Sequence, residues 1–268
     1  MADPTQPDAV EDLKAADAGE LHRAVREEGE EELDRPAAAL FFSAAVAGIA
    51  IGSSLIAEGA LRLHLPDAPW RELVVGFGYP VGFLIVILGR MQLFTESTIT
   101  AALPFFSRPS WPRLGRTLRL WGIVLGANLI GTAITAGLIA AGLLGSDELR
   151  AEMIALSGKI TELGAAATLV NAIPAGFLIA AVAWILPNAR EQSFWVILAI
   201  TYLVAIGGFS HSVVGSGQAF LLLFAGATDL RQTLGEQIGP AVIGNLIGGA
   251  GLFALLAHGQ VRAEGEDA

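Results

Sequence analysis

The feature that most constrains the fold of this chain is the run from Ser193 to Ala227, which contains no Asp, Glu, Lys or Arg. As one straight α-helix this run would be about 52 Å long, whereas about 20 residues suffice to cross the ~30 Å hydrocarbon core of a bilayer. The run is too apolar for a soluble helix and too long for a single span. We therefore predict two half-helices separated by a non-helical break near GGFSHSVVGSG, residues 207–217.

Apolar runs of membrane-spanning length recur along the rest of the chain. Hydrophobic residues make up 53% of the sequence and the mean hydropathy is +0.59, whereas soluble domains are more highly charged and less apolar. The other long uncharged stretches are Ala37–Ala57, Leu120–Leu144, Leu163–Pro187 and Ile238–Ala257. The sequence predicts a helical membrane protein that crosses the bilayer several times.

A second long stretch, Leu73–Phe106, is interrupted by the polar decapeptide GRMQLFTEST at residues 89–98. Charged side chains such as Arg90 and Glu96 are costly at bilayer depth and usually mark a pathway or a site. Non-helical backbone is tolerated there only where it is buried in protein or lines a cavity. We predict a second break at this decapeptide.

The order of these elements indicates an internal repeat. The segments LGANLIGTAITAGLIAAGLL (125–144) and VIGNLIGGAGLFALLA (242–257) both contain a small residue followed by Asn-Leu-Ile-Gly, and small residues let helices approach closely. Each repeat has three spans, an odd number, so the second copy is inverted relative to the first. The predicted fold is an all-α membrane protein with six transmembrane helices in two inverted three-helix repeats, of which the second and fifth helices are broken.

We place this transporter domain at residues 36–258, with repeat one at about 36–144 and repeat two at about 160–258. It is flanked by an acidic extension, 1–35, and an acidic tail, 259–268. We expect the extension to be solvated, and the alternative is a regulatory plug or partner helix. The densest basic loop, 107–120, belongs in the cytoplasm by the positive-inside rule, and six spans then place both termini in the cytoplasm.

Three motifs together resemble the formate/nitrite transporter family. They are L-F-T at 93–95, G-F-x-H-S at 208–212 and Asn-Leu-Ile-Gly in the third and sixth spans, and the resemblance covers roughly residues 37–257. It implies a homopentamer of aquaporin-like subunits in a bacterial inner (plasma) membrane, each conducting a small monovalent anion or its conjugate acid. The partners implied are this solute and the lipid bilayer, with no cofactor, metal or nucleic acid.

Position by position, the resemblance assigns a transport pathway. Its residues are Leu93, Phe94, Thr95, Phe209, His211, Ser212, Asn171, Tyr79 and Phe83. Leu93 and Phe94 would form the hydrophobic constriction, and Thr95 would offer a hydroxyl to the solute or to His211. His211 would share a proton with the anion, since desolvation can keep a histidine neutral and a nearby anion can recharge it.

Each of these residues also has a plain structural interpretation. Thr95 is a competent helix cap, and Leu93 and Phe94 are residue types typical of a core. A buried His211 can simply be satisfied by backbone carbonyls. Placement inside the predicted breaks favours the functional interpretation for His211, Leu93 and Phe94.

Charged residues near the pathway are candidates for electrostatic tuning. Arg90 and Glu96 either form a structural ion pair or polar network, which we favour, or face the cytoplasmic vestibule, where Arg90 would attract anions. Lys159 either attracts anions at the outer mouth or is an ordinary interfacial lysine. Met91 and Gln92 stand where the family usually has a small residue and an acid, so we identify a divergent member.

The predicted function is passive or proton-linked transport of a small monovalent anion or its conjugate acid. The missing acid before L-F-T favours an alternative, a channel for neutral small solutes. An intramembrane enzyme needs a convergent nucleophile or metal set, and the chain has no cysteine and a single histidine at predicted membrane depth. We therefore expect no enzymatic activity, and a non-conducting scaffold is the remaining alternative.

Overall fold

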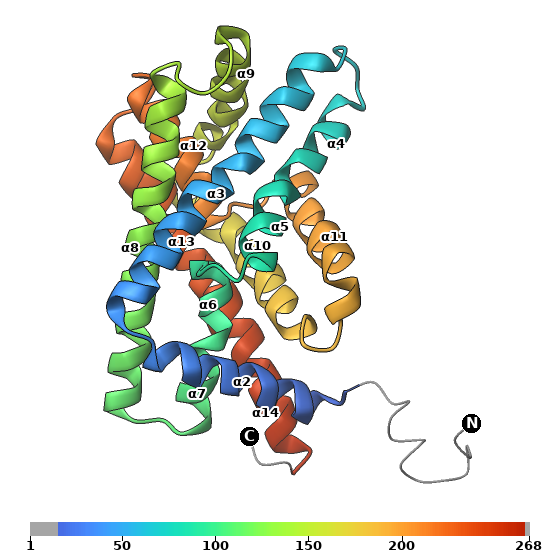
Figure 1. Cartoon of the computed structure of the whole chain (residues 1–268), viewed down its shortest axis with the longest axis vertical. Helices are drawn as coiled ribbons and strands as arrows, with labels where there is room; N and C mark the ends of the chain where they lie inside the picture. The colour runs from blue at the N-terminus through green and yellow to red at the C-terminus, as the bar shows by residue number, and fades with distance from the viewer. Residues whose placement is uncertain (1–15, 266–268) are drawn as a thin grey trace, which may run out of the picture.

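A computed structural model describes residues 16–265, and every regular element within this range is helical (Figure 1). The first half contains α2 (Ala18–Asp34), α3 (Ala37–His64), α4 (Arg71–Val75), η1 (Gly76–Gly78), α5 (Tyr79–Leu88), α6 (Phe94–Thr100), α7 (Ala102–Ser107) and α8 (Trp111–Ala140). The second half contains α9 (Asp147–Gly158), η2 (Lys159–Glu162), α10 (Ala165–Ile185), η3 (Arg190–Gln192), α11 (Ser193–Ile206), α12 (Ser212–Phe224), η4 (Gln232–Ile238), α13 (Gly239–Leu246), η5 (Ile247–Ala254) and α14 (Leu255–Ala263). The elements η4 and η5 are π-helical and continue into α13 and α14.

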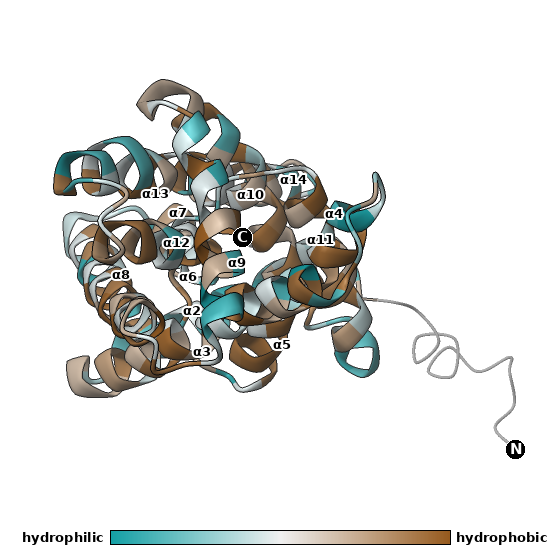
Figure 2. Cartoon of the chain, turned by 90° about the horizontal axis from the view of Figure 1, so that it is seen from above, coloured by the Kyte–Doolittle hydropathy of each residue, from teal (hydrophilic) through white to brown (hydrophobic). Residues whose placement is uncertain are grey.

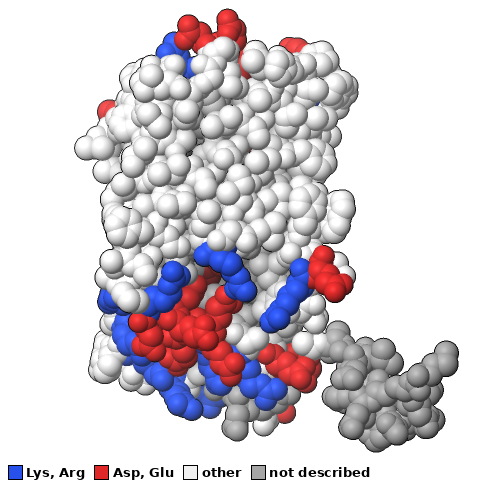
Figure 3. All heavy atoms as spheres, in the orientation of Figure 1, with Lys and Arg blue, Asp and Glu red and all other residues white. Residues whose placement is uncertain are grey.

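Five helical segments within the described range are long and apolar enough to cross a membrane. They are Ala37–His64, Arg71–Leu88, Trp111–Ala140, Ala165–Ile185 and Gln232–Ala263. Figure 3 shows charged side chains gathered at the two ends of the molecule, with an uncharged band between them. Figure 2 shows apolar residues along α5, α8 and α11, the composition that crossing a bilayer requires.

The run Ser193–Ala227 does not form one spanning helix. It is divided into α11, of 14 residues, and α12, of 13 residues, separated by residues 207–211. The first half of the chain has a corresponding break, because α5 ends at Leu88 and α6 begins at Phe94. Both breaks lie where the polar segments of the sequence predicted them.

Close packing of the long helices depends on small residues. A Cβ atom on Gly48 of α3 would overlap the backbone carbonyl of Asn128 on α8, and one on Gly176 of α10 would overlap that of Asn245 on α13. Glycine therefore lets each pair of helices approach to backbone contact. This close approach brings Asn128 and Asn245 within hydrogen-bond distance of the neighbouring helix backbone, at the carbonyls of Ala44 and Ala172.

The acidic extension, where the structure describes it, docks along one face on the helix bundle. Helix α2 begins with a capping box between Asp17 and Glu20 and lies across the end of the bundle against α6, α7 and α14 (Figure 1). Its residues His22, Val25 and Leu33 are buried. One face of this charged helix is apolar enough to dock while its other face stays exposed, and residues 1–15 of the expected solvated extension lie outside the described part of the chain.

The C-terminal boundary also differs from the expectation. Helix α14 continues through position 258 to Ala263, so the predicted boundary between 258 and 259 falls inside a helix. His258 is buried in this helix and lies 3.1 Å from His22, ring nitrogen Nδ1 to Nε2. The described ends of the chain therefore meet at the same end of the bundle.

Candidate transport pathway

The two breaks have the same backbone geometry at a constant shift in residue number. In the first, the N–H of Gly89 donates to the carbonyl of Ile85 and that of Met91 to Val86. In the second, Gly207 donates to Leu203 and Phe209 to Val204. The second residue of each break has a left-handed backbone, with φ of 54° at Arg90 and 63° at Gly208. Such a residue after the last turn ends a helix and satisfies its free carbonyls.

Asn128 of α8 holds the first break in place. Its side-chain oxygen accepts a hydrogen bond from the backbone N–H of Phe94 at 2.9 Å, which caps the start of α6. Its amide nitrogen donates to the carbonyls of Ala44 at 2.8 Å and Gln92 at 3.0 Å. Asn128 thereby pairs one N–H at the start of α6, one carbonyl of the break and one carbonyl of α3.

Asn245 of α13 does the same for the second break. Its side-chain oxygen accepts from the N–H of Ser212 at 2.8 Å, and its amide donates to the carbonyls of Ala172 at 2.8 Å and Ser210 at 3.1 Å. The loop is also held by Asn171, whose amide donates to the carbonyl of Gly208 at 2.6 Å. The predicted pathway residue Asn171 thus shapes the break rather than lining either cavity described below.

His211 lies at the start of α12, and both its ring nitrogens are engaged. Nδ1 accepts the backbone N–H of Val214 at 3.2 Å, so His211 is itself the N-cap of this half-helix. Nε2 lies 2.8 Å from the hydroxyl of Thr95, on the first turn of the other half-helix. Because Nδ1 accepts, the ring proton of a neutral histidine lies on Nε2 and is donated to Thr95.

Thr95 does not cap α6 with its side chain, and His211 is satisfied by a backbone N–H and a hydroxyl rather than by carbonyls. The plain structural interpretations of Thr95 and His211 therefore differ from what is observed, whereas Leu93 and Phe94 are buried in the core as theirs expected. The side chains of Thr95 and His211 join the first turns of α6 and α12.

Aromatic side chains surround this junction. The ring of Phe83 meets that of His211 edge to face, with centroids 5.0 Å apart, and Tyr79 follows at 5.3 Å from Phe83. Phe83, Phe94 and Leu93 are each at most 1% exposed. A small polar solute passing here would meet hydrocarbon on most sides and a histidine–threonine pair on one.

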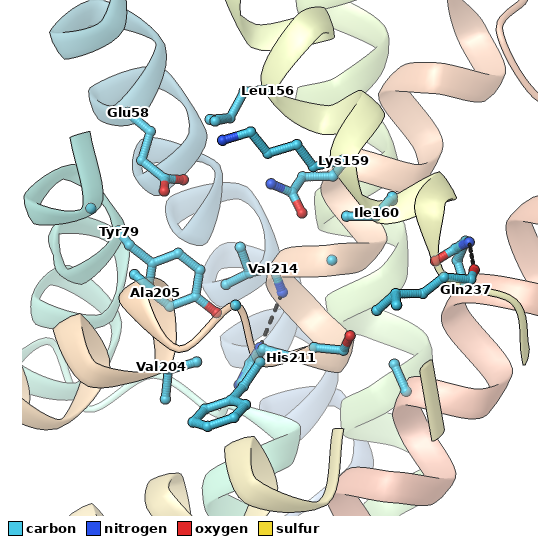
Figure 4. Close-up of a pocket in the computed structure, with 18 of the residues that line it drawn as sticks. Glu58, Tyr79, Leu156, Lys159, Ile160, Val204, Ala205, His211, Val214 and Gln237 are labelled. Carbon is cyan, nitrogen blue, oxygen red and sulfur yellow. Dashed lines mark hydrogen bonds between the residues drawn. The ribbon is translucent and has the colours of Figure 1, made fainter. Parts of the chain in front are cut away.

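On one side of the junction, near α9, lies a cavity of about 350 Å³. We call it the Glu58 cavity; residues lining it include Glu58, Glu72, Tyr79, Lys159, Thr168, Phe209, His211, Ser212 and Gln237. Figure 4 shows Glu58, Tyr79 and Lys159 around it, with His211 at its inner end. The amine of Lys159 pairs with Glu72, so it is not a free cation at this mouth.

On the other side, under α2, lies a cavity of about 620 Å³. We call it the α2 cavity; residues lining it include Glu27, Glu28, Glu31, Glu32, Arg90, Met91, Leu93, Glu96 and Arg190. Figure 3 shows the acidic cluster at this end of the molecule, flanked by basic side chains. Carboxylates outnumber cations in this lining.

Arg90 forms an ion pair, but its partner is Glu28 of α2 at 3.0 Å rather than Glu96. The expected pair within the break is therefore wrong, because the sequence did not reveal that α2 folds over it. Next to this pair, Glu32 accepts hydrogen bonds from Gln92 and Thr100, both at 2.6 Å. Burial raises the pKa of the Glu32 carboxyl, although these two hydrogen bonds favour its ionised form.

Some features of the site were missed from sequence. Glu58 directly follows the uncharged stretch Ala37–Ala57, and a lone carboxylate in an otherwise apolar span was the available signal. The contact of His22 with His258 joins the acidic extension to the last position assigned to the transporter domain, and no local pattern indicated it.

Comparison with known proteins identifies the family. The family model described as formate/nitrite transporter matches residues 19–259. The inner membrane protein YfdC of Escherichia coli is 37% identical over 252 residues, covering 94% of this chain and 81% of that protein. The formate channel BtFdhC of Bacillus thuringiensis is 26% identical over 204 residues, covering 72% of this chain and 76% of that protein.

Solved structures show the same fold. A pentameric formate channel with formate bound has a TM-score of 0.71 at 20% identity, covering 85% of this chain and 98% of that one. An ion channel of the same family has a TM-score of 0.70 at 21% identity, covering 92% and 96%. With a family match across nearly the whole chain and the broken-helix fold already described, this membrane protein belongs to the formate/nitrite transporter family.

Proposed function

We propose that this protein carries a small monovalent anion, or its conjugate acid, along a path from the Glu58 cavity past His211 and Thr95 to the α2 cavity. The observation that carries this proposal is the junction itself: two broken helices present His211 and Thr95 to each other between two cavities. Leu93 and Phe94 form the hydrophobic constriction in this proposal, with Phe83 and Tyr79 on the side of the Glu58 cavity. Phe209 and Ser212 line that cavity.

The proposal includes six spans in two inverted repeats, with α11 and α12 together forming the fifth. The matching hydrogen bonds of Asn128 and Asn245 support it, since equivalent residues hold equivalent breaks. The half-helices α6 and α12 then enter from opposite faces and meet near the midplane, as in other transporters built from inverted repeats.

We further propose that both termini are cytoplasmic. The meeting of α2 with α14 supports placing both on one side, and the basic segment 107–120 supports the cytoplasmic assignment. The α2 cavity is then the inner vestibule and the Glu58 cavity the outer one. A homopentamer is the proposed assembly, supported by the likeness to a pentameric channel.

Charge at the two cavities favours passage of the solute in its protonated, neutral form. Carboxylates outnumber cations in the α2 cavity, and Lys159 in the Glu58 cavity is already paired. A bare anion would be repelled at the inner mouth and would lose hydration at the constriction, which costs several kcal/mol. This charge distribution also favours the second candidate function, a channel for neutral small solutes.

Purified protein in liposomes tests the proposal. A gradient of formate or nitrite is expected to drive solute uptake with a matching change in internal pH, beyond the leak of protein-free liposomes. Substitution of Phe94 or His211 is expected to change the rate. If the protein conducts none of formate, nitrite and hydrosulfide, the proposal is contradicted. Flux of uncharged solutes that does not depend on pH would favour the second candidate.

A further inference from the structure

Polar atoms without partners gather in the Glu58 cavity. Three buried side-chain oxygens that line it have no hydrogen-bond partner among residues 16–265: Glu58 Oε2, Thr168 Oγ1 and Ser212 Oγ. Buried polar groups are normally paired, and leaving one unpaired costs about 1–3 kcal/mol. Three such atoms around one cavity give it the hydrogen-bonding groups that a small polar solute needs.

Among the three, only Glu58 is a carboxyl, the group that can both accept a proton and donate one to a bound anion. It lies in α3, where Gly78 brings the next span against its backbone, and the residue is only 7% exposed. Its carboxyl forms no ion pair with any residue in the described part of the chain.

The charged and titratable groups facing Glu58 come from several elements. Tyr79 on α5, Glu72 on α4, Lys159 on η2 and His211 at the start of α12 line the same cavity. The cation of Lys159 is held by Glu72, which also pairs with Arg62. Glu58 is therefore the carboxyl of this cavity that remains free to bind a solute.

His211 is poorly placed to exchange a proton with a solute in the Glu58 cavity. Its Nδ1 is occupied by the backbone N–H of Val214 and its Nε2 by the hydroxyl of Thr95. Proton transfer at either nitrogen would first break the cap of α12 or the junction between the two half-helices. A group that the solute reaches before the junction is better placed to supply this proton.

We propose that Glu58 is this group: it binds the solute in the Glu58 cavity and exchanges a proton with it, while the hydroxyls of Ser212 and Thr168 offer hydrogen bonds. In the inward direction, the O–H bond of the Glu58 carboxylic acid breaks and an O–H bond forms on an oxygen of the anion. This leaves a Glu58 carboxylate and the neutral acid, which passes the junction. A proton from outer water then restores the Glu58 acid, so one proton accompanies each anion.

This inference rests on the proposed function, and its test distinguishes the two. Wild-type protein in liposomes is expected to take up one proton, measured with trapped pyranine, for each radiolabelled formate. Glu58→Gln keeps the size of the side chain but cannot exchange a proton, so proton-coupled formate uptake is expected to fall about tenfold or more. Glu152→Gln is the matched control, because Glu152 pairs with Arg62 nearby and does not line the cavity.

If Glu58→Gln takes up formate at the wild-type rate and with the wild-type ratio of protons to formate, this inference is overturned and the proposed function still stands. Absence of wild-type flux would overturn the proposed function and the inference with it. A test on the wild-type chain guards against a misfolded variant: dicyclohexylcarbodiimide, which labels protonated carboxyls in apolar surroundings, is expected to label Glu58 by mass spectrometry, and formate to slow this labelling. Absence of labelling, or labelling that formate leaves unchanged, would also overturn the inference.

Discussion

Thr95 and His211 come from different halves of the chain, and their side chains meet with Oγ1 2.8 Å from Nε2. Each belongs to a half-helix that starts at a break, so one hydrogen bond joins the two ends inside the bundle. This bond fixes the ring of His211 between its own backbone cap and the opposing half-helix.

Replacement of Thr95 by Val keeps the shape of the side chain and removes its hydroxyl. The Nε2–H of His211 then lacks a partner, and we expect a loss of about 1–3 kcal/mol in stability together with slower formate flux. Thr95→Ser is the control, since it restores the hydroxyl and both properties. Thermal unfolding in detergent and liposome flux measure the two effects; unchanged stability and flux in Thr95→Val would refute the role assigned to this contact.

Substitution of Asn128 and substitution of Asn245 are expected to destabilise the protein to a similar extent. Leucine at either position leaves one N–H and one carbonyl of a break, and one carbonyl of a neighbouring helix, without their partner. Each substitution is therefore expected to lower the free energy of unfolding by about 3 kcal/mol or more. Asn171→Leu is the comparison. Because Asn171 is only partly buried, this substitution is expected to lower the free energy of unfolding by less. Similar small losses at all three positions in thermal unfolding would show that the asparagines do not hold the breaks.

Arg90 combines a left-handed backbone with an ion pair to Glu28, and two substitutions separate these effects. Arg90→Ala and Arg90→Gly both remove the ion pair, but only glycine adopts φ of 54° without the cost of about 1–2 kcal/mol that other residues meet there. We expect the glycine variant to be the more stable by about 1 kcal/mol. Equal unfolding temperatures for the two variants would indicate that the backbone at position 90 is unstrained.

Docking of α2 is expected to depend on pH through His22. Burial lowers the pKa of His22 to about 4, with smaller contributions from His258 and Arg26. An undocked helix would hold His22 near its ordinary pKa of about 6.5, so the undocked form gains a proton first and docking weakens as pH falls from about 6.5 toward 4. The raised pKa of Glu32 acts in the opposite direction, and a His22→Gln variant therefore isolates the histidine.

The chain has no cysteine, so paired spin labels can report this docking. Labels at R23C on α2 and Q260C on α14 occupy exposed positions. We expect their distance distribution to broaden between pH 6.5 and 4 more strongly with His22 present than in His22→Gln. The same pH response in both proteins would show that His22 does not control docking.

Sequence reasoning predicted the local features of this site and missed the long-range ones. The breaks were predictable because Gly89 and Gly207 lie in apolar runs too long to be single helices. The docking of α2 was not predictable, because its few buried residues, such as His22 and Leu33, are separated by many charged ones. They can be recognised as a docking face only once the structure shows α6 and α14 packed against them. Glu58 was overlooked for a related reason: one carboxylate at the end of an apolar stretch signals a site only when a cavity adjoins it.

The central claim is that the two breaks are inverted copies that frame one passage, and their equivalent residues Met91 and Phe209 test it directly. Met91 lines the α2 cavity and Phe209 the Glu58 cavity. In oriented vesicles, a membrane-impermeant methanethiosulfonate reagent is expected to modify Met91→Cys only from the cytoplasmic face and Phe209→Cys only from the outer face, and to block formate flux in both. Modification of both cysteines from the same face, or full modification without loss of flux, would contradict the account.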